Sequence, residues 1–384
     1  MEDIYFDHAA TTPMLEEVIK AMKPFYNQVF ANPASSHLQG QKAASALEDA
    51  RESVAEFIGA KNAEEVVFTS GGTEADNLAL KGAAMAFSKK GKHIITSQIE
   101  HHAVLKSCEY LKKHLGFEIT YLGVDQNGFV DPAELKEAVR EDTVLISIML
   151  ANNEIGTIQP IKELASVARE NNILFHTDAV QAAGQLKIDV NDLGVDLLSV
   201  SAHKFNGPKG IGALFVRKGV ELIPQLSGGS QERKRRAGTA NPAAAVGMAR
   251  AAEIALKNLK KKSSKLNKLR GYFISQLFST FDNIKLNGPD SEKRLPANIN
   301  IAFKDLDAES ILFNLTLNDI AAATGSACAS GSLSVSHVLK AINLEKEYLK
   351  GAIRFSLGRG NTKEEIDYVM EKLKEIIDRL NSLK

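Results

Sequence analysis

Cysteine is scarce in this sequence, which has only Cys108 and Cys328 among its 384 residues. Two cysteines can build neither a disulfide framework nor a four-thiolate metal site, so we expect neither. A chain without a disulfide framework is typical of a reducing compartment, and we therefore expect a cytoplasmic protein. The same compartment keeps thiols reduced, so one of the two can serve as a working thiol.

An excess of charge of one sign and long apolar runs are also missing. The 47 Lys and Arg residues balance the 47 Asp and Glu residues, so the net charge gives no argument for a nucleic-acid or anionic-membrane partner. No stretch approaches the ~18 consecutive apolar residues that cross a bilayer. The N-terminal sequence MEDIYFDHAATTP lacks a basic segment followed by an apolar one, so no secretory signal is expected. The basic stretch Glu232–Arg236 is too short, in a neutral chain, to indicate direct nucleic-acid binding.

Between about residues 43 and 250 the sequence alternates short apolar runs with longer amphipathic segments. Seven apolar runs are predicted to be strands, at residues 65–69, 93–96, 118–122, 144–150, 173–177, 195–200 and 212–216. Intervening segments are predicted to be helices, at residues 74–87, 103–114, 132–140 and 161–170. Near-continuous apolar strands separated by helices are typical of a mostly parallel sheet covered on both faces. Ligands of such sheets bind beyond the carboxyl ends of the strands.

After residue 250 the pattern changes. A long polar helix is predicted at about residues 252–272. The elements predicted beyond it are two strands and two helices, at residues 299–302, 352–355, 310–315 and 363–380. We therefore predict an α/β fold with two domains. The large domain, residues 14–255, contains a mostly parallel seven-stranded sheet covered by helices, and residues 1–13 and 256–384 form a smaller α+β domain.

Polar groups follow the carboxyl ends of several predicted strands. The first strand runs into Ser70, Gly71, Gly72 and Thr73 and then into a helix. Backbone N–H groups at a glycine-rich helix start bind anions, so this turn is a candidate phosphate cradle, although glycine turns are common. No Gly-Lys-Ser/Thr follows the glycines, which excludes a nucleotide P-loop.

A carboxylate and two amides follow two other strands. Asp178 ends the strand at 173–177, with Gln181 three residues later, and Asn153 follows the strand at 144–150. An acid at this place is often only a helix cap. A pyridine-type cofactor, however, needs a carboxylate there, because a protonated ring nitrogen makes the ring an electron sink. The amides then hold the ring hydroxyl, or else they merely form a turn.

Lys204 follows the strand at 195–200, after Ser201 and His203, in a turn flanked by glycine and proline. A desolvated lysine has a lowered pKa, which supplies the neutral amine that a covalent link to a carbonyl cofactor requires. Taken alone, a lysine in a turn is more often solvated. Together with Asp178 and the phosphate cradle, Lys204 predicts a cofactor site at the edge of the sheet.

Three further residues have both a functional and a structural interpretation. His101, after the strand at 93–96, either stacks on the cofactor ring or is a structural histidine. Cys328 lies among small residues in GSACASGS, which indicates a mobile loop, although free cysteines are usually small buried hydrophobes. Arg354, alternating with apolar residues on a predicted strand, clamps a substrate carboxylate or forms an internal salt bridge. Cys108, within a helix pattern, is expected to be a buried hydrophobe.

The assembled motifs closely resemble the cysteine desulfurases of the NifS/IscS type, within the fold-type I, class-V aminotransferase family. The resemblance runs nearly end to end through motifs that occur in order: FDHAATTP at 6–13, NPASSH at 32–37, FTSGGTEADN at 68–77, EHHAVL at 100–105, ANNEIGTIQP at 151–160, HTDAVQ at 176–181, SAHKFNGPKGIGAL at 201–214, GSACASGSL at 325–333 and IRFSLGR at 353–359. It implies pyridoxal 5′-phosphate as cofactor, L-cysteine as substrate, and L-alanine and a persulfide as products.

The resemblance also implies roles for individual residues. Lys204 carries the cofactor, Cys328 receives the sulfur and His101 lies over the ring. The implied cofactor contacts are Gly72, Thr73, Asn153, Asp178, Gln181, Ser201, His203 and, from a second subunit, Thr239. Arg354 and Asn153 bind the substrate carboxylate. The implied assembly is a homodimer that passes sulfur to an acceptor protein, such as an iron–sulfur scaffold or a tRNA-thiolating enzyme.

No metal site is expected, apart from a transient contact between Cys328 and an iron–sulfur acceptor. Departures from the family pattern are Lys234, Arg235 and Ala237 in QERKRRAGT, next to the intersubunit phosphate contact, and Gly72 in place of a common alanine. The alternatives are another fold-type I activity, namely an aminotransferase or a selenocysteine lyase, and a scaffold that has lost catalysis.

Overall fold

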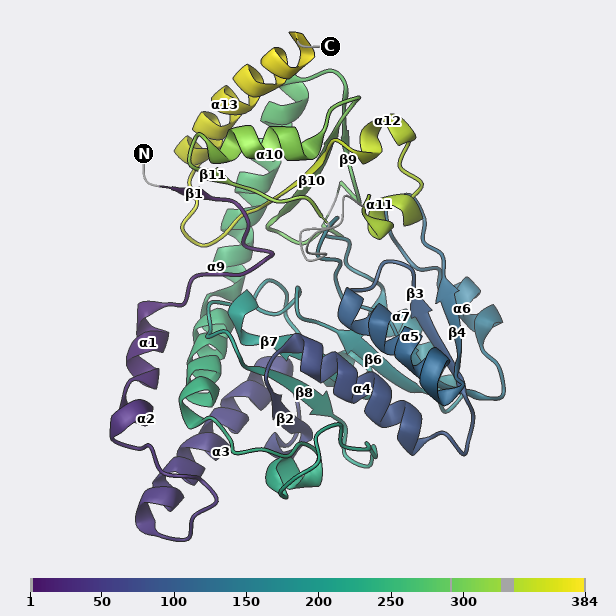
Figure 1. Cartoon of the computed structure of the whole chain (residues 1–384), viewed down its shortest axis with the longest axis vertical. Coiled ribbons are helices and arrows are strands. Elements are labelled where there is room, and N and C mark those ends of the chain that lie inside the picture. The colour runs from purple at the N-terminus through teal and green to yellow at the C-terminus, as the bar shows by residue number, and fades with distance from the viewer. Residues whose placement is uncertain (1–2, 291, 326–334, 383–384) are drawn as a thin grey trace.

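The computed structural model describes residues 3–290, 292–325 and 335–382 (Figure 1). Its strands are β1 Ile4–Tyr5, β2 Val66–Thr69, β3 His93–Ser97, β4 Glu118–Leu122, β5 Thr143–Ser147, β6 Leu174–Asp178, β7 Leu197–Ser201, β8 Gly212–Val216, β9 Ile284–Leu286, β10 Asn298–Phe303, β11 Ile320–Ala321 and β12 Ala352–Ser356.

The α-helices begin and end as follows: α1 Glu16–Met22, α2 Pro24–Asn27, α3 Leu38–Ile58, α4 Gly72–Ala86, α5 His102–Leu115, α6 Pro132–Ala138, α7 Ile161–Glu170, α8 Val190–Leu193, α9 Pro242–Thr280, α10 Ala308–Thr316, α11 His337–Ala341, α12 Lys346–Leu349 and α13 Lys363–Ser382. Three short 3-10 turns complete them: η1 Ala63–Glu65, η2 Ala202–Lys204 and η3 Gln231–Lys234. None of the helices in the described ranges is both long enough and apolar enough to cross a membrane.

A seven-stranded sheet in the order β2-β8-β7-β6-β5-β3-β4 forms the centre of the larger part of the molecule. Only β8 runs antiparallel to its neighbours, and the pairs from β7 to β4 are all parallel. All seven predicted strands are present, so the prediction of a mostly parallel α/β sheet is confirmed. Since β8 reverses between β2 and β7, β2 points the same way as the parallel strands. Its phosphate-cradle turn therefore lies at the same sheet edge as the ends of β5, β6 and β7.

Both faces of this sheet are covered by helices. On one face α4 and α5 pack over a core that includes Leu78, Cys108 and Leu197. The other face is covered by α3, α7 and the first part of α9, with Phe175 and Met248 in its core. The successive strand residues Leu145 and Ile146 belong to opposite cores, because adjacent side chains on a strand point to opposite faces.

The smaller part of the molecule contains the antiparallel sheet β12-β10-β9 and the parallel pair β1–β11. Its core joins the far end of α9, at Phe273 and Leu277, to α10 and α13. The prediction for the long helix was too short, because α9 begins ten residues before position 252. That first stretch is alanine-rich and largely buried, so it has no polar face to mark it as a helix. The sequence analysis also did not identify α3.

Figure 1 shows the small part above the large sheet, with α9 running between them and the N-terminal strand β1 beside the C-terminal elements. We propose that the domains divide as the sequence predicts, at residue 255 within α9 and with residues 1–13 in the small domain. The pairing of Ile4–Tyr5 with Ile320–Ala321 supports the second part of this division.

Candidate active site

A cavity of about 300 Å³ opens at the carboxyl edge of the large sheet. Nine of the predicted site residues line it: Gly72, Thr73, His101, Asn153, Asp178, Gln181, Ser201, His203 and Lys204. The remaining lining residues are Ala10, Asp76, Met149 and Val180. The structure thus brings together the amine, the carboxylate and the glycine-rich helix start that the sequence placed on separate strand ends.

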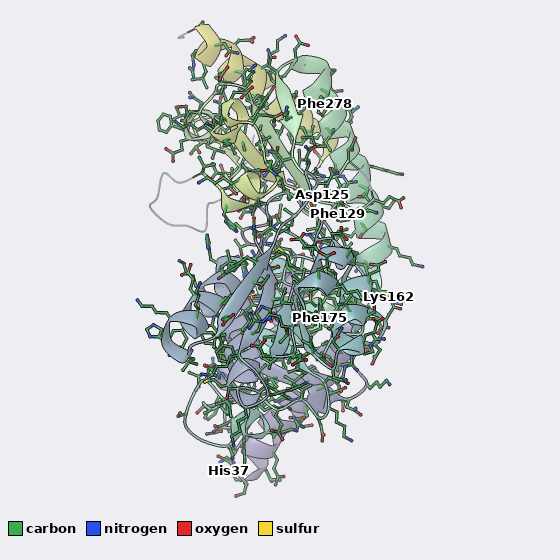
Figure 2. All side chains as sticks on the ribbon, turned by 90° about the vertical axis from the view of Figure 1, so that its right-hand side faces the viewer. His37, Asp125, Phe129, Lys162, Phe175 and Phe278 are labelled. Atoms are coloured by element: carbon green, nitrogen blue, oxygen red, sulfur yellow. The ribbon has the colours of Figure 1, made fainter. Side chains whose placement is uncertain are left out.

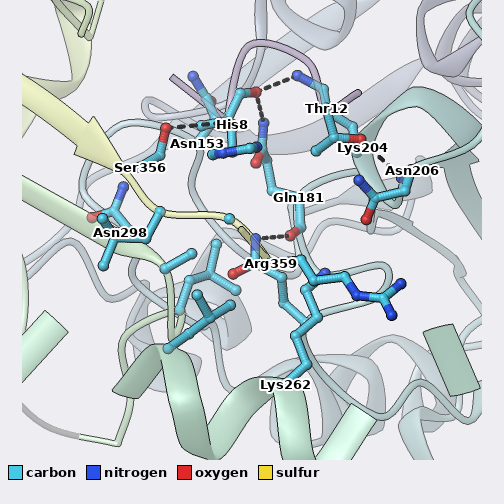
Figure 3. Close-up of a pocket in the computed structure, with 17 residues that line it drawn as sticks. His8, Thr12, Asn153, Gln181, Lys204, Asn206, Lys262, Asn298, Ser356 and Arg359 are labelled. Carbon is cyan, nitrogen blue, oxygen red and sulfur yellow. Dashed lines mark hydrogen bonds between the residues drawn. The ribbon is translucent and has the colours of Figure 1, made fainter. Parts of the chain in front are cut away.

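Lys204 ends the turn η2, directly after β7. Its Nζ donates hydrogen bonds to the carbonyl oxygens of Ala9 and Ala10, the second at 3.0 Å. Gln181 Nε2 donates to the same Ala9 oxygen at 2.9 Å, so the side chains of Lys204 and Gln181 converge on this carbonyl group (Figure 3). The N-terminal segment therefore returns from β1 to form one wall of the site.

The anion end of the cavity is formed by Gly72 and Thr73 in the first turn of α4, together with Ser201 and His203. A Cβ atom built on Gly72 would lie 2.7 Å from Cγ2 of Val180, so the glycine lets this turn approach the loop after β6. Burial and the nearby Lys204 lower the pKa of His203 to about 4. The imidazole is therefore neutral at pH 7, and its Nδ1 lies 3.1 Å from Thr11 Oγ1.

Asp178 forms the opposite end of the cavity and is only 6% exposed. Burial raises the pKa of its carboxyl to about 6, although the Val180 N–H, which donates to Oδ1 at 2.8 Å, and Lys204 both favour the ionised form. The hydrogen bond from the Val180 N–H closes a local turn, which corresponds to the structural role considered for Asp178 in the sequence analysis. Asp178 lines the cavity, so its carboxylate can pair there with the protonated ring nitrogen of a pyridine-type cofactor.

The side of the cavity is lined by His101, the N-terminal cap of α5. Its Nδ1 accepts a hydrogen bond from the Ala103 N–H at 3.1 Å. Burial and, next, the charge of Lys204 lower the pKa of His101 to about 4. The capping hydrogen bond is the structural interpretation of His101. A neutral ring at physiological pH can also stack on a cofactor or accept a proton, and this functional interpretation stays a prediction.

Arg354 lies on β12 and is 2% exposed. Its Nη2 donates to Asp7 Oδ1 at 2.8 Å and its Nη1 to the Asn153 carbonyl oxygen at 3.1 Å. The internal salt bridge that the sequence analysis left open is therefore present. The buried Nε has no hydrogen-bond partner within the described ranges. Through Asn153 the guanidinium stays next to the cavity, although it does not line it.

Two other residues discussed above, Thr239 and Cys108, do not line the cavity. Thr239 is exposed and does not line it. Cys328 lies outside the described residues. Cys108 is fully buried, and burial raises the pKa of its thiol to about 12. The structure thus agrees with the expectation that Cys108 is an inert core residue.

The unusual stretch before Thr239 forms a tight turn in which Glu232, Arg233 and Lys234 all have positive φ angles. The Glu232 carboxylate is almost fully buried and accepts hydrogen bonds from Arg51 Nη1 at 2.6 Å and Nη2 at 3.1 Å. It also accepts one from the Phe68 N–H at 2.9 Å, next to the end of β2. These contacts offset the cost of the left-handed backbone.

Arg236 extends this anchoring to the phosphate-cradle turn. Its Nε and Nη2 donate to the two carboxylate oxygens of Glu74 at 2.7 and 3.1 Å. Glu74 also accepts a hydrogen bond from the Ser70 N–H at 2.7 Å. The segment that carries Thr239 is therefore tied to the same turn that holds Gly72.

Two buried acids near the site were missed by the sequence reasoning. Asp76 lines the cavity one turn into α4, and its Oδ1 has no hydrogen-bond partner among the described residues. Burial and then the negative charge of Asp178 raise the pKa of Asp76. Burial raises the pKa of Glu100 to about 8. Both acids belong to motifs given in the sequence analysis, FTSGGTEADN and EHHAVL. Their burial, however, depends on packing and leaves no signal in the residue pattern.

Metal binding has no support in this region. Within residues 3–290, 292–325 and 335–382, no three His, Cys, Asp or Glu side chains are grouped so that they could hold a metal ion. The site is instead suited to an organic cofactor that bears an anionic group, a carbonyl and a basic ring nitrogen.

Comparison with known proteins agrees with this chemistry. The family model for class-V aminotransferases matches residues 4–369. The chain is 54% identical over 381 residues to the cysteine desulfurase IscS of Dictyoglomus turgidum, covering 99% of this chain and 96% of that protein. The solved structure of a NifS-like protein matches with a TM-score of 0.92 at 39% identity, covering 98% of this chain and 100% of that one.

A second solved structure, of SspA in complex with cysteine, has a TM-score of 0.81 at 37% identity and covers 92% of this chain and 98% of its own. The curated relatives do not favour an aminotransferase or a selenocysteine lyase. The chain belongs to the class-V aminotransferase family and, within it, to the cysteine desulfurases of the NifS/IscS type.

Proposed function

We propose that this chain uses pyridoxal 5′-phosphate to remove sulfur from L-cysteine, giving L-alanine and a persulfide on Cys328. The observation that carries the proposal is the single cavity shared by Lys204, Asp178 and the N-terminal turn of α4. When bound, the cofactor withdraws electrons from the α-carbon of an amino acid linked to it.

Each predicted site residue has a definite role in this proposal. Gly72, Thr73, Ser201 and His203 would hold the phosphate, and the carboxylate of Asp178 would keep the ring nitrogen protonated. Asn153 and Gln181 would bind the ring hydroxyl, and the neutral His101 would lie over the ring. Lys204 would carry the cofactor, and its amine would move the proton of the substrate α-carbon.

The substrate carboxylate binds to Arg354 and Asn153. Two of the three nitrogens of this guanidinium already have partners, so the substrate either uses Nε or shares the group with Asp7. A bidentate arginine–carboxylate pair fixes the orientation of the amino acid as well as its charge.

Cys328 performs the sulfur step. Its thiolate attacks the Sγ atom of the substrate, so that an S–S bond forms while the Cβ–S bond breaks. The electron pair of that bond remains with the alanine skeleton, which is then protonated and leaves as L-alanine. Cys328 keeps the sulfur as a persulfide, and no external oxidant or reductant is required.

Assembly, destination and compartment belong to the same proposal. We place Thr239 on the phosphate of a second subunit in a homodimer, as the family resemblance implies; it is exposed and does not line the cavity of its own subunit. The persulfide passes to an acceptor protein, such as an iron–sulfur scaffold or a tRNA-thiolating enzyme, in the cytoplasm. Cys328 makes a transient contact with an iron–sulfur acceptor.

The test is to incubate the holoenzyme with L-cysteine and to locate added sulfur by mass spectrometry. We expect one extra sulfur on Cys328 and none on the buried Cys108. Cys328→Ala should keep the visible absorbance of the cofactor and lose at least 99% of alanine formation, whereas Cys108→Ala should keep both. Full desulfuration by Cys328→Ala would remove Cys328 from the mechanism. Lys204→Ala should abolish the wild-type cofactor spectrum.

A further inference from the structure

The described residues on both sides of the 326–334 segment, which carries Cys328, meet one buried side chain, that of Glu154. On the C-terminal side, Ser336 Oγ donates a hydrogen bond to Glu154 Oε2 at 2.5 Å. On the N-terminal side, a Cβ atom built on Gly325 would lie 2.1 Å from the same oxygen. The carboxyl group of Glu154 therefore packs directly against the backbone of Gly325 and binds Ser336.

Glu154 is itself held rigidly between the two sheets. It is 3% exposed and lies in the turn after β5, where Asn152 Oδ1 accepts a hydrogen bond from its N–H at 2.8 Å. Its carbonyl oxygen accepts hydrogen bonds from Asn298 Nδ2 at 2.9 Å and Asn300 Nδ2 at 3.1 Å, both on β10. The backbone of Glu154 is therefore anchored on both sides, and its carboxyl group is buried rather than a surface contact.

The same flanking residues are tied to the substrate end of the site. Ala323 forms two backbone hydrogen bonds with Arg354, one in each direction, at 3.2 and 2.7 Å. After Ser336, the His337 Nε2 lies 3.0 Å from the carbonyl oxygen of Glu100 and donates to it. Arg354 and Glu154 thus fix the two ends of the segment with respect to the residues that line the cavity.

The ionisation state of the Glu154 carboxyl group depends on its few partners. Burial raises the pKa of the Glu154 carboxyl, while the hydrogen bond from Ser336 and the charge of Arg354 favour its ionised form. Since the group is buried, it depends on these few partners, and losing it would leave the Ser336 hydroxyl without its acceptor.

We propose that Glu154 is a positioning residue for the sulfur step: it clamps Gly325 and Ser336, and so sets where the Cys328 segment begins and ends relative to bound substrate. The inference rests on the proposed desulfurase function. It assigns Glu154 no direct contact with substrate or cofactor, so substrate binding and sulfur transfer should separate in its variants.

The experiment compares Glu154→Ala and Glu154→Gln holoenzymes with the wild type in two measurements. The first is the Kd for L-cysteine, read from the visible spectrum in the Cys328→Ala background. We expect this to change less than twofold. The second is the single-turnover rate of sulfur loading on Cys328, read by mass spectrometry. We expect at least a tenfold loss for Glu154→Ala and a smaller one for Glu154→Gln, whose amide oxygen can still accept from Ser336.

Ser336→Ala should follow Glu154→Ala, because it removes the other half of the hydrogen bond. Asp307→Ala is the matched control: Asp307 caps α10 in the same part of the molecule by accepting from the Ser310 N–H at 2.8 Å, and it should load sulfur at the wild-type rate. Wild-type loading in Glu154→Ala would overturn the proposal. A rise in Kd as large as the loss of loading would also overturn it, since Glu154 would then support substrate binding.

A further measurement needs no sulfur transfer. Alkylation of Cys328 by iodoacetamide should change at least threefold in Glu154→Ala, with the buried Cys108 as the unreactive internal reference. If the wild type acquires no sulfur on Cys328, the proposed function fails. The alkylation rates then decide the role of Glu154 by themselves, and equal rates in wild type and variant would refute it.

Discussion

Asp178 shows how burial alone changes the chemistry of a single residue. Its pKa of about 6 means that the carboxyl is ionised at pH 7 but takes up a proton within two pH units below that. Only the ionised form pairs with a protonated ring nitrogen, so the pair is present above about pH 6 and is lost as the pH falls through this value.

We therefore predict that the affinity of the wild-type protein for pyridoxal 5′-phosphate falls up to tenfold per pH unit below pH 6. Asp178→Asn should bind more weakly at pH 8 and lack this component of the pH dependence. Absorbance titrations between pH 5 and pH 8 measure it. The protonation of the cofactor's own phosphate is common to both proteins and cancels in the comparison. Identical slopes for the two proteins would contradict the assignment.

Among the elements, the turn η3 depends on α3 through one buried ion pair. Arg51 and Glu232 have side chains that are 2% and 5% exposed, and Arg51 Nη1 also donates to the Val66 carbonyl oxygen. Removing one partner of a buried pair leaves an uncompensated charge, which costs about 3–5 kcal/mol. The pair anchors the turn in which Glu232 and Arg233 have positive φ angles.

Arg51→Met should accordingly lower the free energy of unfolding by about 3 kcal/mol, as measured by urea denaturation followed by circular dichroism. Arg250→Met is the control, because Arg250 pairs with Glu253 on the surface of α9, with both side chains nearly half exposed. Exposed pairs contribute about 0–1 kcal/mol. Equal effects of the two substitutions would show that the buried pair adds nothing to stability.

For the whole molecule, the distribution of exposed apolar side chains bears on assembly. Tyr26, Phe30 and Leu38, in and after α2, are 60%, 73% and 75% exposed. Neighbouring exposed apolar side chains of this size mark interaction surfaces. His37, which directly precedes Leu38 in the chain, lies at the opposite end of the molecule from Phe278 (Figure 2).

We predict that these side chains form the interface of the proposed homodimer, so that Phe30→Asp combined with Leu38→Asp shifts the protein from dimer to monomer in sedimentation velocity experiments. Phe278→Asp, which introduces the same charge at a side chain that is 50% exposed on α9, should leave the dimer intact. If the double variant remains dimeric, the homodimer uses another surface.

The sequence by itself determined the large sheet and predicted most of the residues that line the cavity. Apolar strand runs can be recognised because both faces of a parallel sheet are buried. The polar residues that follow these strands then lie together at the carboxyl edge of the sheet. This reasoning found Lys204, Asp178 and the Gly72–Thr73 turn. It missed the first turns of α9, because an alanine-rich helix buried on most sides has little amphipathic pattern. It also missed α3, although the buried residues of that helix recur every three or four positions from Gly40 to Val54.

Only the tertiary structure decided which partners each charged group has. It paired Arg354 with Asp7 and brought the carbonyl oxygens of Ala9 and Ala10 to Lys204. It also brought the Glu154 carboxyl group into contact with both flanks of the Cys328 segment. These contacts join residues more than 150 positions apart. Local propensity and hydrophobic period are short-range properties, whereas pairing across the fold depends on how the two sheets and α9 come together.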